Sequence, residues 1–516
     1  MLFVLAAVTS VALSGVAGAF AVHENNTGST AIVQPIDPRV LARRASDPAD
    51  SKLELPTLHL APPLLVDLSA LAAAEPTSTD GGVASIGTVG VAGPGVAIPG
   101  VAGPAAAIPG ADGVRVTPVE ARLLPKLSGA QLLQQLGLLP ADQLAAFAKY
   151  NPTSIQRLLV SPPKATVVSA VWTGLTAGQK RALATSAPQL VGNLDGIPFT
   201  VRDSANRLYL ASSIAEAKRS LAQGSGRGQI VSEKHHLEIL RQIERTLKTK
   251  SGEPARQLLT LDPSGDARAA VVVGNLSTAN YVSYLVPGMF FTVQGQMYDW
   301  TTIAQDLYTE QARWLKILAK SDSSYHGKTA ATVAWIGYST PGMLDIASLS
   351  RADQGANILG SAIDGVKAVR SGSEPFISLV THSYGSTAAM IELAKGGVSV
   401  DALAMIGSPG SAAQTARELS VKNDNVYVGE AAWDPVVNTA FYGSDPGSSS
   451  FGARTMDVAG GVDAITHKKL SAAVGHLGYF DAGSQAMRNL ALVGLNQGSL
   501  VSNGTLADAK RTLASQ

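Results

Sequence analysis

The first regular pattern of hydrophobic and polar positions predicts helices. Between about residues 119 and 221, apolar residues recur at spacings of three and four, most clearly in 129–136 and 141–148. The stretch 175–183 predicts a further helix, and Thr176 is a suitable N-cap because its hydroxyl can accept a bond from an unpaired amide of the first turn. This part of the chain is therefore expected to be a helical region.

Two segments near the end of this region have a different character. Residues 192–207 show little periodicity and are rich in turn formers and polar groups, which predicts a loop tied by Asp and Asn side chains or a border of an active site. Residues 230–250 predict a charged amphipathic helix. His235 and His236 are adjacent and would point to different helical faces, so we expect a solvated face and not a metal site.

From about residue 267 onward, short apolar and β-branched runs alternate with helical patterns such as 300–320 and 354–369. Alternation of this kind predicts a mostly parallel sheet with helices on both faces. The expected fold class is therefore α/β. The predicted strands are 269–273, 281–286, 332–336, 376–381, 402–406 and 425–429.

The amino-terminal residues 1–22 are almost continuously apolar and are followed by the polar stretch 23–27. Small residues at 17, 19 and 21 would suit a signal peptidase, but no Lys or Arg precedes the apolar run. About twenty residues can also span a bilayer. We expect either a signal peptide or an uncleaved membrane anchor, and hence export to the cell envelope or the extracellular space.

Residues 23–117 are expected to form a low-complexity spacer. They include two similar ten-residue segments, 91–100 and 101–110, in which Pro and Gly are too dense for helix or sheet. Two copies are too few for a solenoid. The alternative interpretation is an elastin-like interaction segment.

Composition narrows the range of functions. The 516 residues include 46% hydrophobic residues, 51 Gly and 27 Pro, enough for a sizeable core beside a spacer. The formal net charge of +1 offers no electrostatic argument for a nucleic-acid partner. The absence of Cys excludes disulfides, thiolate chemistry and Cys-based metal sites. No residue pattern indicates a cofactor.

The candidate chemistry centres on Ser383. It lies between the predicted strand 376–381 and a helix-forming run that ends at Gly396, the layout of a strand–turn–helix nucleophile elbow. The turn requires small residues two positions before and after the serine. Gly385 meets this requirement, whereas Thr381 stands where the motif has Gly. An ordinary turn that contains a serine is the alternative.

A serine hydrolase of this architecture has its acid and then its histidine after the serine. His467 and His476 follow the last predicted strand; two lysines beside His467 would disfavour an imidazolium, so His476 is the better general base. Asp434, in a turn made rigid by Pro435, is the expected acid. Glu430 is the reserve, and Asp445 and Asp457 are expected to be solvated loop acids.

An oxyanion hole needs two backbone donors. The amide of Tyr384, directly after the serine, is one. The other is expected from the loop after strand 281–286, where Pro287 has no N–H, so that Gly288 or Met289 donates. His382 is expected to be packed or hydrogen-bonded and not a second base.

Several motifs resemble a family of exported or envelope-associated actinobacterial α/β-hydrolases. The resemblance covers roughly residues 170–485 and implies the α/β-hydrolase fold with a Ser-Asp-His triad carried onto Ser383, Asp434 and His476. It supplies no substrate. The motifs are 192–198, 202–207, 286–289, 333–338, 381–386, 406–410 and 434–436.

The resulting hypothesis is a serine esterase acting on a small-molecule or lipid-like acyl substrate, since 289–291 is apolar. An amidase or peptidase with the same triad, or a non-catalytic envelope binding protein, are the alternatives. The expected domains are a signal peptide or anchor (1–22), a spacer (23–117), a helical region that could cap the pocket (118–250), a catalytic domain (251–500) and a tail (501–516).

Overall fold

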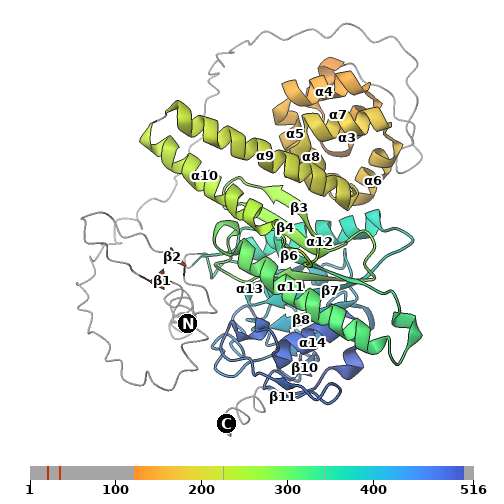
Figure 1. Cartoon of the computed structure of the whole chain (residues 1–516), viewed down its shortest axis with the longest axis vertical. Coiled ribbons are helices and arrows are strands. Elements are labelled where there is room, and N and C mark those ends of the chain that lie inside the picture. The colour runs from red at the N-terminus through yellow and green to blue at the C-terminus, as the bar shows by residue number, and fades with distance from the viewer. Residues whose placement is uncertain (1–19, 22–33, 36–120, 225, 343–344, 505–516) are drawn as a thin grey trace, which may run out of the picture. The chain divides into compact units, whose positions relative to one another are not determined.

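The computed structural model describes residues 20–21, 34–35, 121–224, 226–342 and 345–504 (Figure 1). The apolar segment 1–22, the spacer and the tail therefore lie almost wholly outside the described residues. Before residue 121, the described residues form two short paired strands, β1 (Phe20–Ala21) and β2 (Gln34–Pro35). Among the described helices, none is long and apolar enough to cross a membrane.

An eight-stranded sheet forms the centre of the unit that contains residues 121–504. Its strand order is β10-β9-β8-β7-β5-β6-β4-β3, and all neighbours from β6 to β10 are parallel, while β3 and β4 are antiparallel additions at one edge. The strands are β3 (Arg256–Asp262), β4 (Arg268–Gly274), β5 (Tyr281–Val286), β6 (Ala330–Ile336), β7 (Phe376–His382), β8 (Ala402–Ile406), β9 (Val426–Gly429) and β10 (Arg454–Met456).

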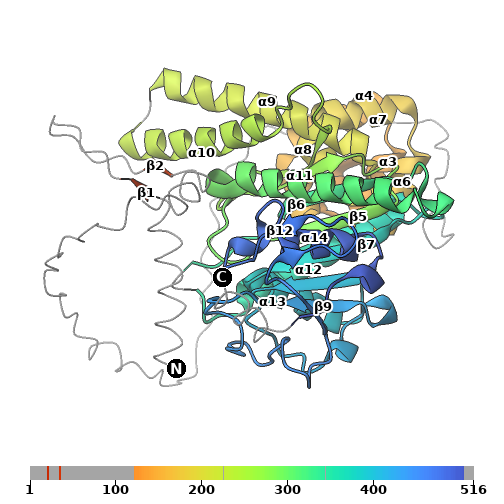
Figure 2. The ribbon, with the colours of Figure 1, turned by 60° about the horizontal axis from the view of Figure 1, so that its bottom comes forward.

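Helices cover both faces of this sheet, as alternation of side chains along each strand requires. Val271 and Val273 of β4 point into a core with α11 (Val293–Leu318) and α14 (Gln485–Gly494), while Ala270 and Val272 point into the opposite core with α12 (Ser350–Val369) and α13 (Tyr384–Ala394). The close contact of α11 with α14 can be followed in Figures 1 and 2. The predicted α/β class and all six predicted strands are confirmed.

The helical region has two parts. Six helices enclose a third, separate core: α3 (Gly129–Leu138), α4 (Ala141–Tyr150), α5 (Pro152–Val160), α6 (Ala165–Gly174), α7 (Ala177–Ser186) and α8 (Pro188–Asn193). The predicted cap of α7 is present, because Thr176 and Gln179 form a reciprocal capping box.

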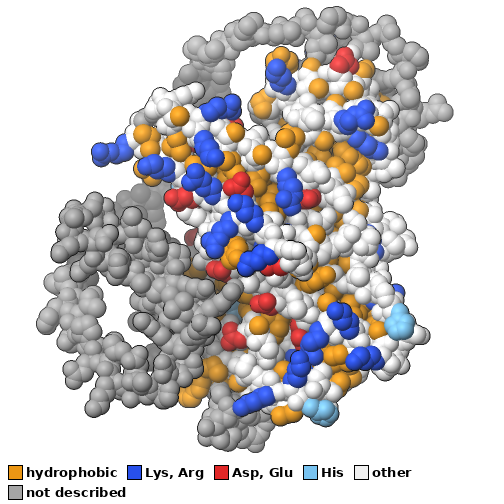
Figure 3. All heavy atoms as spheres, in the orientation of Figure 1, with side chains coloured by type: hydrophobic (Ala, Val, Ile, Leu, Met, Phe, Trp, Pro, Cys, Tyr) orange, Lys and Arg blue, Asp and Glu red, His pale blue; other side chains and the backbone are white. Residues whose placement is uncertain are grey.

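The second part is a pair of long helices, α9 (Phe199–Gln223) and α10 (Arg227–Thr246). Their apolar side chains share the core of α11 and α14, so the predicted boundary near residue 250 does not separate two cores. Lys and Arg side chains stand over these helices with Asp and Glu among them (Figure 3). The helical region contacts β3, α11 and α12, and its role as a cap stays a prediction.

The prediction for residues 192–207 was right about the ties by Asp and Asn side chains, but only 194–198 is a loop. The segment comprises the end of α8, this loop and the start of α9, and its polar side chains bond the backbone of β3, the last strand of the sheet. Asp203 accepts from the Leu258 amide at 2.7 Å, Asn193 accepts from the Leu261 amide at 2.8 Å, and Asn206 donates to the Leu258 carbonyl at 3.0 Å. The polarity of this segment thus serves to satisfy an edge strand.

We predict that Asn206→Ala lowers the free energy of unfolding by about 2–3 kcal/mol. Asn206 is fully buried and also donates to the Gly192 carbonyl at 2.9 Å, so the Leu258 and Gly192 carbonyls each lose one donor, and Gly192 keeps the bond from Arg202. Urea unfolding followed by circular dichroism measures the change. Asn357→Ala, at an exposed position of α12, makes the same chemical change and should shift the midpoint little. Equal shifts would contradict this role.

Candidate active site

Ser383 lies in the turn between β7 and α13, at the carboxyl edge of the sheet. Its backbone has φ 54° and ψ −131°, a region that non-glycine residues rarely adopt. A Cβ at Gly385 would lie 2.4 Å from the Pro287 carbonyl oxygen and 2.6 Å from that of Val286. Glycine is therefore required there, and the close approach of α13 to the end of β5 holds the strained turn.

Thr381, which departs from the elbow motif, fits without displacing the turn. Its side chain is completely buried, and its hydroxyl donates to the Ala404 carbonyl of β8 at 3.0 Å. A hydrogen-bonded hydroxyl can be buried at little cost. The side chain thus lies towards the neighbouring strand.

His476 and Asp434, 42 positions apart in sequence, form a buried pair. The Nδ1 atom of His476 lies 2.9 and 3.0 Å from the two carboxylate oxygens of Asp434. The Asp434 side chain is fully buried, and 11% of the His476 side chain is exposed. This arrangement leaves Nε2 as the ring nitrogen not occupied by the carboxylate.

Two further groups bond the Asp434 carboxylate. The Tyr479 hydroxyl donates to Oδ2 at 2.6 Å, and the Val436 amide donates to Oδ1 at 2.9 Å. Burial alone would raise the pKa of Asp434, but the bonds from His476, Tyr479 and Val436 outweigh it and lower that pKa. The carboxylate is consequently ionised at neutral pH. Tyr479 is a site residue that the sequence analysis missed, since nothing in its spacing marks it.

Contacts through β8 bring the serine next to this pair. The Ser383 amide donates to the Ile406 carbonyl at 3.0 Å. The following residue, Gly407, has φ 58°, and a Cβ there would lie 2.9 Å from Asp434 Oδ2 and 3.0 Å from the His476 ring. The Ser383 hydroxyl itself is buried and has no hydrogen-bond partner among the described residues.

The loop after β5 packs directly on the serine. A Cβ at Gly288 would lie 2.6 Å from Ser383 Cβ and 3.1 Å from its hydroxyl oxygen. Within the described residues, the amides of Met289 and Tyr384 donate to no backbone or side-chain acceptor. The Tyr384 ring is buried, and its hydroxyl donates to the Ser348 carbonyl at 2.8 Å.

The competing candidates lie elsewhere. His467 is exposed on the hairpin formed by β11 (Gly461–Val462) and β12 (Lys469–Leu470). Glu430 abuts Gly447, where a Cβ would lie 2.1 Å from its carboxylate. Asp445 and Asp457 each accept an amide bond within their own loops.

His382 supports the loop that carries the candidate base. Its Nε2 lies 2.7 Å from the His476 carbonyl oxygen and so donates to it, whereas its Nδ1 is buried without a partner. Phe291, Tyr479 and Phe480 surround the ring at centroid distances of 5.6–6.4 Å. Burial first, and then repulsion from His476, lower the pKa of His382 to about 3. It is therefore neutral and positions His476.

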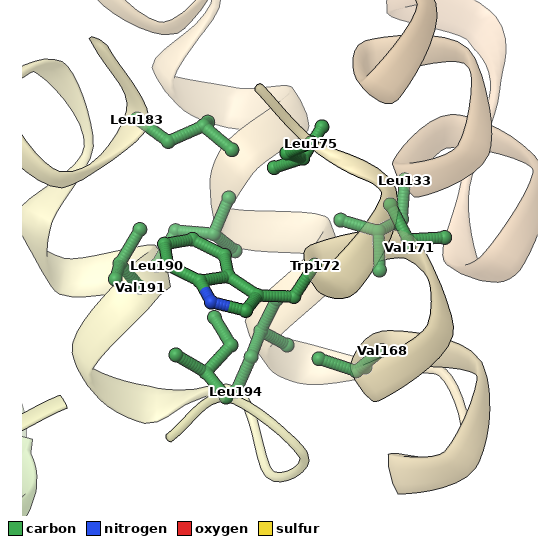
Figure 4. A pocket seen from close by; sticks show the side chains of 10 residues that line it. Leu133, Val168, Val171, Trp172, Leu175, Leu183, Leu190, Val191 and Leu194 are labelled. Carbon is green, nitrogen blue, oxygen red and sulfur yellow. The ribbon is translucent and has the colours of Figure 1, made fainter. Parts of the chain in front are cut away.

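No group of three or more His, Asp or Glu side chains that could hold a metal ion occurs in the described part of the chain. A small apolar cavity lies among α3, α6, α7 and α8, and the residues that line it are hydrophobic (Figure 4). It contains none of the candidate site residues. We regard it as a packing defect of the helical core.

A sequence model of the α/β-hydrolase family matches residues 262–444, and the predicted α/β-hydrolase fold is confirmed. An uncharacterized protein of Mycobacterium tuberculosis is 26% identical over 436 residues, covering 73% of this chain and 64% of that protein. An uncharacterized protein of Mycobacterium bovis is 27% identical over 216 residues, covering 41% and 77%. The chain thus spans less than two thirds of the first relative, and the actinobacterial resemblance is confirmed.

Solved structures with some likeness include carboxyl esterase 2 of Tuber melanosporum, at 11% identity and a TM-score of 0.30, covering 49% of this chain and 89% of that one. A thermostable esterase from Pseudomonas putida is 12% identical with a TM-score of 0.28, covering 57% and 98%.

The buried neutral imidazole of His382 predicts a pH dependence of stability. Its pKa is about 3 in the folded protein and 6.5 ordinarily, so between these values the unfolded chain binds a proton that the folded chain does not. The full contribution of the neutral His382 to the free energy of unfolding is present above pH 6.5 and is lost as the pH falls towards 3.

We expect wild type to lose about 1.4 kcal/mol more per pH unit than His382→Gln across this window, because glutamine keeps a donor but does not titrate. Urea unfolding of both proteins at a series of pH values measures the difference. Parallel curves would show that His382 is not held neutral.

Proposed function

We propose that this protein is a serine hydrolase that cleaves carboxylic ester bonds through an acyl-enzyme. The observation that carries the proposal is the buried His476–Asp434 pair, which is linked through Ile406 and Gly407 to a serine at φ 54°. A serine hydroxyl is a weak nucleophile unless an oriented base removes its proton. The α/β-hydrolase family match supports hydrolysis in general.

In the proposed first half-reaction, Ser383 Oγ attacks the ester carbonyl carbon while Nε2 of His476 takes the hydroxyl proton. Asp434 fixes the ring and stabilises the imidazolium. The amides of Tyr384 and Met289, or of Gly288, bond the oxyanion. When the tetrahedral intermediate collapses, the ester C–O bond breaks and the imidazolium protonates the alkoxide.

In the second half-reaction, a water molecule gives a proton to His476 and attacks the acyl-enzyme carbonyl. The Ser383–acyl bond then breaks, the serine regains the proton, and a carboxylic acid leaves. The missing hydrogen bond of Ser383 is compatible with this mechanism, because catalytic bonds often tighten only when substrate is bound. Tyr479 adds orientation, since it bonds the carboxylate that holds His476.

The proposed substrate carries an apolar acyl or aliphatic group. Met289 and Phe291, in the loop that packs on Ser383, are partly buried apolar side chains beside the proposed oxyanion donors. Thr381 is the departure from the elbow motif that keeps a non-catalytic protein as the alternative, and the bond of its hydroxyl to β8 is compatible with a catalytic site. We further propose export to the cell envelope or beyond, on the apolar pattern of residues 1–22.

Labelling with a fluorophosphonate tests the nucleophile. We expect a single adduct on Ser383 in the folded protein and none in Ser383→Ala. Asp434→Asn should slow labelling by about 10²–10⁴-fold, because the imidazole loses its orienting carboxylate. Asp445→Asn, at a loop acid, is the matched control and should label normally. An unlabelled Ser383 in folded protein would refute the proposed mechanism.

Paired substrates separate an esterase from an amidase with the same triad. We expect p-nitrophenyl esters of medium acyl chains to be cleaved at least about 10²-fold faster than the matching anilides, because the proposed site offers no added support for an amine leaving group. Initial rates with both series measure the ratio. Comparable rates would favour the amidase alternative.

A further inference from the structure

Exposed apolar side chains are concentrated on the loops that carry Asp434 and His476 and on the β11–β12 hairpin that precedes the second of them. Of the ten large hydrophobic residues that are exposed in the described chain, five lie at position 433 or between positions 462 and 477. Single exposed apolar residues are ordinary, but a cluster marks an interaction surface. The five are Trp433 (76% exposed), Val462 (69%), Ile465 (42%), Val474 (48%) and Leu477 (53%).

Three of these residues sit on two loops that are joined to each other. Ala432 pairs with Val474 in a parallel bridge, and the Gly475 amide donates to the Ala432 carbonyl at 2.9 Å. Trp433 therefore stands next to the strand that leads to His476. We call Trp433, Val474 and Leu477 the apolar rim.

The apolar rim is adjacent in sequence to the catalytic candidates. Trp433 precedes Asp434, and Leu477 follows His476. Trp433 adopts φ 62°, so its exposure is combined with a strained backbone. The side chains that enter the site and those that face solvent thus come from the same two loops.

The exposed charged side chains of the β11–β12 hairpin are basic. Val462 and Ile465 belong to the β11–β12 hairpin, whose exposed Lys468 and Lys469 follow them. The only acid from 461 to 477 is Asp463, which is buried and paired with Arg488 at 2.5 Å. Beyond this stretch, Glu430 is half-buried and Asp481 is exposed.

We infer that the apolar rim and the β11–β12 hairpin form a docking surface for an anionic lipid bilayer. Protruding Trp, Leu and Val side chains can enter the region of the lipid headgroups, where an indole is favoured because one edge is apolar and the N–H is polar. Lys468 and Lys469 add attraction to anionic headgroups. Small apolar tips on loops suit insertion better than the broad, flat contact of a protein dimer.

The consequence for chemistry rests on the proposed function. A protein docked by the apolar rim would have Ser383, Asp434 and His476 beside the lipid surface. Its substrate would then be an ester held in that surface, such as a glycerolipid. The docking itself does not need the serine, so Ser383→Ala should dock like wild type.

The fluorescence of Trp433 reports on this surface. The chain has five tryptophans, and the other four, Trp172, Trp300, Trp314 and Trp335, are buried. The full-length protein is mixed with phosphatidylcholine vesicles containing phosphatidylglycerol and a nitroxide-labelled lipid. We expect quenching of Trp433, whatever other part of the chain also binds lipid, and no quenching in Trp433→Phe.

Charge and apolar variants complete the test. The double variant Lys468→Glu with Lys469→Glu should need at least about tenfold more of the anionic vesicles for half-maximal quenching. Wild type should likewise need at least about tenfold more lipid when the vesicles contain phosphatidylcholine alone. Val462→Ser with Ile465→Ser should also weaken docking. Val160→Ser, at an exposed position of α5, is the control and should change nothing.

Two outcomes would overturn the inference. One is a protein that floats with the vesicles while Trp433 stays unquenched, which would locate binding elsewhere. The other is a blue shift of Trp433 with rising protein concentration and no lipid, which would make this face a contact between copies. Labelling of Ser383 is scored separately, so a failure of docking and a failure of the proposed mechanism can be told apart.

Discussion

The close approach of two backbone segments at Gly385 is the constraint on which the site depends. The start of α13 lies against the Val286 and Pro287 carbonyls so tightly that no side chain fits. This contact holds Ser383 in its strained conformation and also brings Gly288 against the serine. Strain of this kind persists only where the surrounding packing over-determines it. Here the parallel strands β5 and β7, which are buried except at their first residues, supply that packing.

Much of this arrangement could be predicted from the sequence, because the strands of a buried parallel sheet are continuous runs of apolar, often β-branched residues. The bounds predicted for β5 and β8 agree with the structure, and β4, β6, β7 and β9 differ by one or two residues. The pairing of His476 with Asp434 followed from chain order and loop chemistry. These features depend on local patterns together with one topological rule.

What could not be predicted depends on contacts between distant residues. Strand β3 was missed because polar residues flank it and its amides are satisfied partly by the side chains of α8 and α9. The same bonds explain why the helical parts of residues 192–207 were misread as a loop, since helical residues that bond a strand edge look like turn formers. Tyr479 and His382 were assigned no role at Asp434 and His476 because each acts through a contact that no spacing indicates.

The loops that carry the acid and the base can be understood as one unit with two faces. The bridge between Ala432 and Val474 joins the two loops. The Tyr479 hydroxyl accepts from the Ala431 amide, and Nε2 of His382 donates to the His476 carbonyl. The inner face buries the Asp434 carboxylate, which accepts bonds from His476, Tyr479 and Val436, and burial strengthens the electrostatic interaction between Asp434 and His476. The outer face exposes Trp433 and Leu477. Because one pair of loops makes both faces, Trp433 and Leu477 are each joined to a candidate catalytic residue by a single peptide unit, so a change at the outer face is expected to shift the inner one.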